Sequence, residues 1–154
     1  MIVESLLIAS VGIIIISSAL LLGYLWFVVR ANPPLSTRIL KIGTASITVE
    51  CADTMLRRAR GLSYQKSLEP GNGMLFVFSK PGVYGFWMQG MQFPIDIVWI
   101  RDNIVVATTE HIPVEDTLSR KHYYPPLPVS QVLELPAGEI QRTGIVTGAS
   151  IALQ

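Results

Sequence analysis

A long run without charge near the N-terminus is the feature that most constrains this chain. Between Glu4 and Arg30 no residue is charged, and the segment "LLIASVGIIIISSALLLGYLWFVV" is mostly aliphatic. At about 1.5 Å per residue in a helix, such a run is long enough to cross a hydrocarbon core of roughly 30 Å. The run predicts one transmembrane helix, so the remaining residues must build a fold of their own.

Two alternatives to a retained anchor remain open. A cleavable signal peptide would have a basic n-region and an apolar core of about 7 to 15 residues, which this run lacks, although Val29 and Ala31 match the small-residue cleavage rule. A buried core helix would show some polar face, and none is visible. We therefore expect an anchor over residues 1–30, contact with the lipid bilayer through residues 5–29, and a Pro-containing linker over residues 31–37.

The part of the chain beyond the anchor is close to electrical balance. The chain has 12 Lys and Arg against 11 Asp and Glu, and removing Arg30 and Glu4 with the anchor leaves 11 against 10. This balance gives no electrostatic basis for binding nucleic acid. The single cysteine, Cys51, has no second thiol for a disulfide, and we expect it to be a buried residue at the end of a strand.

Residues 38–154 consist of short apolar or alternating runs between turn residues. The first two runs, "RILKI" and "ASITVEC", are separated by Gly43-Thr44 and predict a hairpin, and Asp102-Asn103 predicts another. The further expected strands are "GMLFVF", "VYGFWM", "IDIVWI", "IVVATTEHI", "SQVLEL" and "GIVTGASIAL". Six to eight short strands predict a mainly β fold, as a single antiparallel β-sandwich or a small barrel-like domain.

One short helix is expected between the second and third strands. Asp53 or Thr54 can cap its N-terminus, and Gly61 can end it. Met55 and Leu62 would lie on its apolar face, whereas its arginines are expected to be solvated. Because no other segment of residues 38–154 shows a helical pattern, this helix is expected to be the only one in the domain.

Motifs of known enzymes are mostly missing from the sequence. There is no phosphate-binding glycine loop, no nucleophile elbow and no paired-histidine metal motif. His111 and His122 lie 11 residues apart, a spacing that matches no zinc framework. The sequence therefore predicts neither a metal nor a cofactor.

Asp96, in the segment "PIDIVWI", is the most unusual polar residue. Both faces of its predicted strand are apolar, and a buried carboxylate needs a cation or several hydrogen-bond donors. Two hypotheses follow. Asp96 forms an internal pair with an arginine that fixes the helix onto the sheet, or it lies at the base of an aromatic pocket near Trp87, Met88 and Phe93.

Glu134 raises a related question in "VLELP". It stands between Leu133 and Leu135, so it is either a second buried carboxyl group or, by strand alternation, a residue that faces solvent.

Four segments in a fixed order carry a family resemblance. They are "RARGL" at residues 58–62, "GMLFVF" at 73–78, "FWM" followed by "PID" at 86–96, and "VLELPAG" at 132–138. With these segments, the chain resembles domain-of-unknown-function family 192 over about residues 39–153. The resemblance implies a single β-rich sandwich or barrel domain with a short helix. The family's activity is not established, so the resemblance implies no reaction.

The resemblance also bears on orientation and on the motif residues. Basic residues after the anchor alone would leave the C-terminal domain inside the cell. Members often follow a secretion signal or a membrane anchor, so we expect a single-pass protein whose C-terminal domain is extracytoplasmic. Where the family usually has a lysine and an asparagine after the tryptophan and methionine, this chain has Gln89 and Gly90, and Ser63 stands where a methionine is common. Any part that the usual lysine plays in holding an anionic ligand would be missing here.

The sequence thus favours a membrane-anchored binding or accessory module for an unknown small-molecule, glycan or protein ligand. The candidate ligand-binding residues are Arg60, Trp87, Met88, Phe93, Asp96 and Glu134. The alternative is a small, hydrolase-like cell-envelope enzyme in which Asp96 is the general acid or base and Arg60 stabilises charge.

Overall fold

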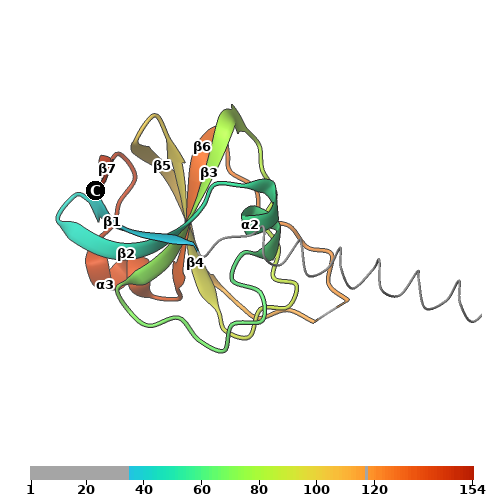
Figure 1. Cartoon of the computed structure of the whole chain (residues 1–154). Coiled ribbons are helices and arrows are strands. Elements are labelled where there is room, and N and C mark those ends of the chain that lie inside the picture. The colour runs from blue at the N-terminus through green and yellow to red at the C-terminus, as the bar shows by residue number, and fades with distance from the viewer. Residues whose placement is uncertain (1–34, 117) are drawn as a thin grey trace, which may run out of the picture. The chain divides into compact units, whose positions relative to one another are not determined.

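Seven strands build one curled sheet in the computed structural model of this chain, which describes residues 35–116 and 118–154 (Figure 1). The strands are β1 (Ser36–Ile42), β2 (Ala45–Ala52), β3 (Asn72–Gly82), β4 (Ile95–Arg101), β5 (Ile104–Ile112), β6 (Val129–Pro136) and β7 (Ile151–Leu153). Their order in the sheet is β5-β4-β6-β3-β2-β1-β7. The prediction of a mainly β fold is confirmed.

Both predicted hairpins are present. Strands β1 and β2 pair antiparallel on either side of Gly43, whose φ is 56°. Strands β4 and β5 are joined by Asp102 and Asn103, with φ values of 51° and 61°. Two consecutive residues with positive φ match the twist of a tight hairpin, and Asp and Asn tolerate this conformation better than most residues.

The prediction of an antiparallel sandwich is wrong in two respects. A single sheet replaces the two sheets of a sandwich, and β2 pairs with β3 in parallel. A parallel pair needs a crossover connection, which a short helix and a long loop provide here. The two edges of the sheet also approach each other, because Val105 of β5 exchanges backbone hydrogen bonds with Gly148 and Ala149 just before β7. The result is a half-barrel, which agrees with the barrel-like alternative.

Two of the expected strands differ in the structure. The segment "VYGFWM" forms a single isolated bridge, between Phe86 and Tyr123, because both partners belong to loops. Of the segment "GIVTGASIAL", only Ile151–Leu153 is a strand. Because Tyr123 lies in the long connection from Pro113 to Pro128, its bridge to Phe86 fixes that connection to the domain.

The described residues contain two short helices, so the expectation of one helix is wrong. Helix α2 (Met55–Arg60) begins after Thr54, whose hydroxyl accepts a hydrogen bond from the Arg57 N–H, and ends at Gly61, as predicted. Met55 is 81% exposed, so it forms no apolar face of this helix. Helix α3 (Glu139–Thr143) lies between Gly138 and Gly144, both with positive φ.

The sheet is covered on both faces, and each face has its own hydrophobic core. One core contains Leu133, Leu135 and Cys51 and is closed by Ile140 of α3. The other contains Met74, Phe76 and Val132 and is closed by Leu62 after α2 and by the loops around residues 86–93 and 123. In Figure 1 the two helices accordingly lie on different sides of the sheet. Cys51 is buried near the end of β2, as expected.

The described part of the chain contains no helix that is both long enough and apolar enough to span a membrane. The apolar run at residues 5–29, on which the prediction of an anchor rests, lies outside the described residues.

Candidate functional site

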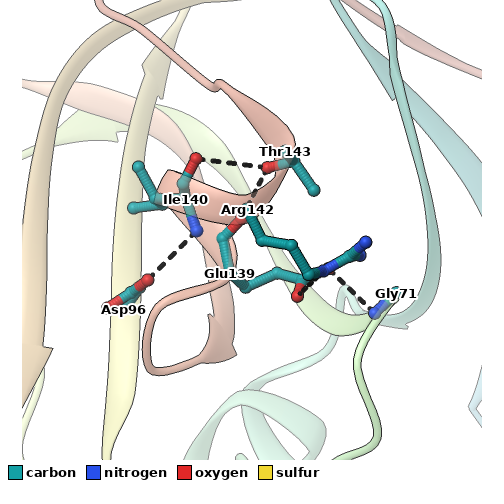
Figure 2. A network of polar contacts seen from close by, with 6 residues as sticks. All are labelled: Gly71, Asp96, Glu139, Ile140, Arg142 and Thr143. Carbon is teal, nitrogen blue, oxygen red and sulfur yellow. Dashed lines mark hydrogen bonds and ion pairs between the residues drawn. The ribbon is translucent and has the colours of Figure 1, made fainter.

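Asp96 connects two irregular pieces of backbone. Its Oδ1 accepts a hydrogen bond of 2.8 Å from the His111 N–H, where a bulge in β5 gives His111 a φ of 54°. Its Oδ2 accepts one of 3.1 Å from the Ile140 N–H in the first turn of α3 (Figure 2). The N-cap residue of that helix, Gly138, has no side chain to do this. The predicted arginine partner of Asp96 is therefore replaced by two backbone donors.

Glu139 completes this polar network. Its carboxylate accepts a hydrogen bond of 2.8 Å from the Gly71 N–H and pairs with Arg142, and the Thr143 hydroxyl donates to its backbone carbonyl (Figure 2). The hydrogen bonds from Arg142 are the main reason that the pKa of Glu139 is lowered. Every carboxylate in this network has donors, so it holds α3 to the sheet and to the loop before β3.

Glu134 lies on the opposite face of the sheet from Asp96. It pairs across the strands with Met74 of β3 and Ile97 of β4, so its side chain points into the core that these residues share. Only 4% of its surface is exposed, and its Oε2 has no hydrogen-bond partner. Burial raises the pKa of Glu134 to about 8, so the group is mostly protonated at neutral pH.

Glu134 also lines an open cavity of about 320 Å³ between α2 and the loop at residues 84–91. Five aromatic residues line the same cavity: Phe76, Phe78, Tyr84, Phe86 and Trp87. Ligand pockets in proteins are typically about 300 to 1,000 Å³, mostly apolar, and carry a few polar groups that fix orientation. The cavity has this size and composition.

The aromatic walls are held in place by ring packing. Tyr84 stacks on Phe78 with 3.6 Å between ring centroids, and its hydroxyl donates to the Lys80 carbonyl. Phe86 meets Phe76 edge to face at 4.9 Å. Trp87 is half exposed and contacts the His122 ring at 5.4 Å. The walls are therefore formed before any ligand arrives, and Trp87 stands at the solvent side.

Two arginines of α2 line the cavity as well. The Nη1 atom of Arg58 donates to the carbonyls of Asp53 and Val77, each at 2.8 Å, and its guanidinium lies 5.0 Å from the Phe78 ring centroid. Arg60 is exposed, and its side chain makes no hydrogen bond or ion pair with a described residue. Arg58 is thus fixed in position, whereas the sequence had predicted a solvated side chain.

The structure brings three of the six candidate residues together and separates the others. Arg60, Trp87 and Glu134 line the cavity. The remaining three are Met88, a buried core residue, Phe93, which packs half-buried against the same core, and Asp96 on the other face. The pair of Asp96 with Arg60, on which the enzymatic alternative rested, is not formed.

Several residues that line the cavity are not among those predicted from the sequence. Phe76 and Phe78 lie two residues apart on β3, on the face that also carries Met74, which pairs with Glu134. Strand alternation therefore contained a signal for a carboxyl group next to aromatic rings. The position of Arg58 had no such signal, because its contact with Val77 crosses the helix–sheet interface.

Among residues 35–116 and 118–154, no group of three His, Cys, Asp or Glu side chains is placed so that it could hold a metal ion. Four titratable residues in these ranges line the cavity: Glu134, Arg58, Arg60 and Tyr84.

Two solved structures share this fold. One is a protein from Sinorhizobium meliloti 1021, provisionally called a transcription regulator, with 28% identity and a TM-score of 0.71 over 79% of this chain and 97% of that one. The other is a protein of unknown function from Novosphingobium aromaticivorans DSM 12444, with 24% identity and a TM-score of 0.70 over 79% of this chain and 94% of that one.

Comparison with curated proteins finds no match. Residues 38–153 match the family DUF192, which is described as "Uncharacterized ACR". This match covers all seven strands except the first residues of β1, and with it both helices and the cavity. The chain therefore belongs to domain-of-unknown-function family 192.

Proposed function

We propose that this protein is a binding module that takes a small organic molecule into the cavity between α2 and residues 84–91. The observation that carries the proposal is the Glu134 carboxyl group, buried at an aromatic-lined opening with an oxygen that has no partner. A buried polar atom without a partner costs about 1 to 3 kcal/mol. A ligand that satisfies this atom would remove the cost, and this gives the position a reason to remain polar.

The alternative of an enzyme built on Asp96 receives less support. Asp96 is fully buried, and its two oxygens are engaged by the N–H groups of His111 and Ile140. A general acid or base must reach its substrate, and Arg60 lies on the other face of the sheet. Nucleic-acid binding is not proposed either, because the chain beyond the anchor has 11 basic and 10 acidic residues and so almost no net charge.

The proposal includes a tether to the membrane. The uncharged run at residues 5–29 supports a single-pass anchor. An extracytoplasmic domain is supported by the resemblance, because members of the family often follow a secretion signal or a membrane anchor. Fusing alkaline phosphatase, which is active only outside the cytoplasm, after Gln154 tests this part. Activity in the membrane fraction is expected. A fusion that is inactive while a cytoplasmic reporter at the same site is active would reverse the orientation.

Binding to the cavity can be measured with one-ring probes on the full-length chain. Phenol and benzyl alcohol are suitable, and Trp87, which is 50% exposed and lines the cavity, provides a fluorescence signal. Trp99 is buried and contacts Phe86 of the cavity wall, so the Trp87→Phe variant is needed to assign the signal. We expect saturable changes in fluorescence for at least one probe, and their loss in Trp87→Phe.

A blocking variant shows whether the probes occupy this cavity. Ala59 of α2 lines it, so Ala59→Phe places a ring in the opening. Leu56→Phe is the matched control, because Leu56 is exposed on the same helix and does not line the cavity. Binding should be lost in Ala59→Phe and kept in Leu56→Phe. Equal binding by both variants, or no saturable binding of any probe, would overturn the proposed function.

A further inference from the structure

The two ends of the cavity differ in charge, and this difference selects among ligands. The carboxyl group of Glu134 lies at the buried end, whereas Arg58 and Arg60 belong to α2 at the exposed end. Resting on the proposed function, we infer that the ligand is a one-ring organic anion with a hydroxyl group opposite its anionic group. Its anionic group meets the arginines, its ring lies between the aromatic walls, and its hydroxyl meets Glu134.

Arg58 is prepared to receive an anion. One nitrogen, Nη1, makes both of its hydrogen bonds, to the carbonyls of Asp53 and Val77, and the Phe78 ring supports the guanidinium plane. Its Nε and Nη2 donate to no described residue. A guanidinium fixed in this way offers two parallel donors to a carboxylate without losing further side-chain freedom.

The positive charge around Arg58 is only partly neutralised by the protein, because Asp53 is the one acidic residue of the described chain that interacts with both Arg57 and Arg58 there. The carboxylate of Asp53 pairs with Arg57 at 2.7 Å, and Arg58 itself bonds only to uncharged carbonyls. Arg60 adds a second positive charge that has no acidic partner among the described residues. The opening therefore carries excess positive charge, which favours an anion and disfavours an organic cation.

The buried end excludes a purely apolar ligand tip. A fatty acid could place its carboxylate at Arg58, but its methyl end would leave the Glu134 oxygen without a partner. A hydroxyl group can both donate to and accept from a protonated carboxyl group. The volume of about 320 Å³ is near the lower end for ligand pockets, which fits a molecule with one ring.

A set of four matched probes tests the inference on the full-length chain. 4-Hydroxyphenylacetate has both polar ends, phenylacetate lacks the hydroxyl, 4-methylphenol lacks the anion, and tyramine replaces the anion with a cation. Because a hydrogen bond to a charged group is worth roughly a factor of ten or more in affinity, we expect 4-hydroxyphenylacetate to bind at least about tenfold more tightly than 4-methylphenol and tyramine. Its hydroxyl bonds to a neutral carboxyl group, so it should bind roughly fivefold more tightly than phenylacetate. Titration calorimetry and Trp87 fluorescence measure these affinities.

Three variants assign the ends of the ligand. Arg60→Gln should reduce the preference for 4-hydroxyphenylacetate over 4-methylphenol. Arg58→Lys should reduce this preference further because, although lysine keeps the charge, it loses the planar fork that binds a carboxylate through two donors. Glu134→Leu should remove the preference for 4-hydroxyphenylacetate over phenylacetate. Since Arg58 also holds α2 to β3, the folding of the Arg58→Lys variant is checked by circular dichroism. If that variant is unfolded, Arg60→Gln is decisive.

The outcomes separate the inference from the proposed function. If the four probes bind with equal affinity and Ala59→Phe abolishes their binding, the cavity binds small molecules and the inferred ligand class is wrong. Tighter binding of tyramine would assign an organic cation to Glu134 and would also overturn the inference. If none of the four binds while phenol or benzyl alcohol does, the inference alone fails. If no probe of either set binds, or if Ala59→Phe changes nothing, both the inference and the proposed function fail.

Discussion

Asp96 and Glu134 lie on adjacent strands, and both are buried carboxyl groups, yet their surroundings are opposite. Asp96 of β4 points into the core closed by α3, and backbone N–H groups of His111 and Ile140 bond to its two oxygens. Glu134 of β6 points to the other face, where its Oε2 has no partner and an open cavity begins. The first group is satisfied by the protein, and the second is not.

This difference distinguishes a structural acid from a candidate binding residue. Charged groups that remain buried are normally paired or hydrogen-bonded, because the fold otherwise loses stability. Asp96 obeys this rule and fixes a bulge and a helix terminus in place. Glu134 departs from it beside an opening, where a partner can come from outside. Four predictions test the comparison, in order of expected effect.

The largest effect is expected for Asp96→Ala. It leaves the N–H groups of His111 and Ile140 without their acceptor, and bonds to charged groups contribute about 1.5 to 3 kcal/mol each. The free energy of unfolding should fall by about 3 kcal/mol or more in urea denaturation. Asp96→Asn should lose less, because one oxygen remains. An Asp96→Ala variant within about 1 kcal/mol of the original protein would refute the structural role.

The second effect is a pH dependence that belongs to Glu134. Its pKa is about 8 in the folded protein against 4.5 as the ordinary value, so the folded state keeps a proton that the unfolded state releases between these pH values. Stability should therefore fall as pH rises from about 4.5 to about 8, by a few kcal/mol in total, since each pKa unit corresponds to about 1.4 kcal/mol.

Glu134→Gln is the matched control for this pH dependence, because it keeps the shape and cannot ionise. Unfolding of both proteins is compared from pH 5.5 to pH 8.5. Glu139, with its lowered pKa, contributes the opposite trend, and that contribution is lost only as pH falls through the acidic range. Parallel stability curves for the two proteins would show that Glu134 is already ionised in the folded state.

The third prediction is a gain in stability. Glu134→Leu removes the unpartnered oxygen and fills the same space with an apolar side chain, so the unfolding free energy at pH 7 should rise by about 1 to 2 kcal/mol. The preference of the cavity for 4-hydroxyphenylacetate over phenylacetate should be lost in the same variant. A variant that is destabilised by more than 1 kcal/mol would indicate that Glu134 has a stabilising partner.

The smallest effect is expected in the polar network around α3, where the carboxylates have hydrogen-bond donors. Arg142→Ala removes an exposed guanidinium from Glu139, but the Gly71 N–H still donates to that carboxylate. Glu139 is buried, but Arg142 is 56% exposed and its charge is screened by water, so this pair should contribute about 1 kcal/mol. Thermal unfolding should therefore change little. A loss above about 2 kcal/mol would mean that Arg142, rather than the backbone donors, holds this side of the fold.

Local signals in the sequence predicted much of the fold. Turn residues located the hairpins at Gly43 and at Asp102-Asn103, and Thr54 and Gly61 predicted both ends of α2. These features depend on backbone conformations that a few neighbouring residues determine. Such signals do not depend on the rest of the chain, so they survive in the structure.

The errors concern contacts between distant segments. Helix α3 has a glycine N-cap, and the acceptor that replaces the cap is Asp96, 44 residues earlier in the chain. The segment at Phe86 finds only the loop residue Tyr123 as a partner, so it forms a bridge instead of a strand. Glu134 was recognised as ambiguous, but its side of the sheet depends on register with β3, which the sequence of β6 does not contain.

A carbon-13 NMR titration of the Glu134 carboxyl group tests the central claim most directly. The signal can be assigned by its absence in Glu134→Gln, and its chemical shift can be followed from pH 4 to pH 10. A buried carboxyl group without a partner should titrate with a pKa of about 8. A midpoint near the ordinary value of 4.5 would mean that water or a protein donor already satisfies Glu134, and the contrast with Asp96 would disappear.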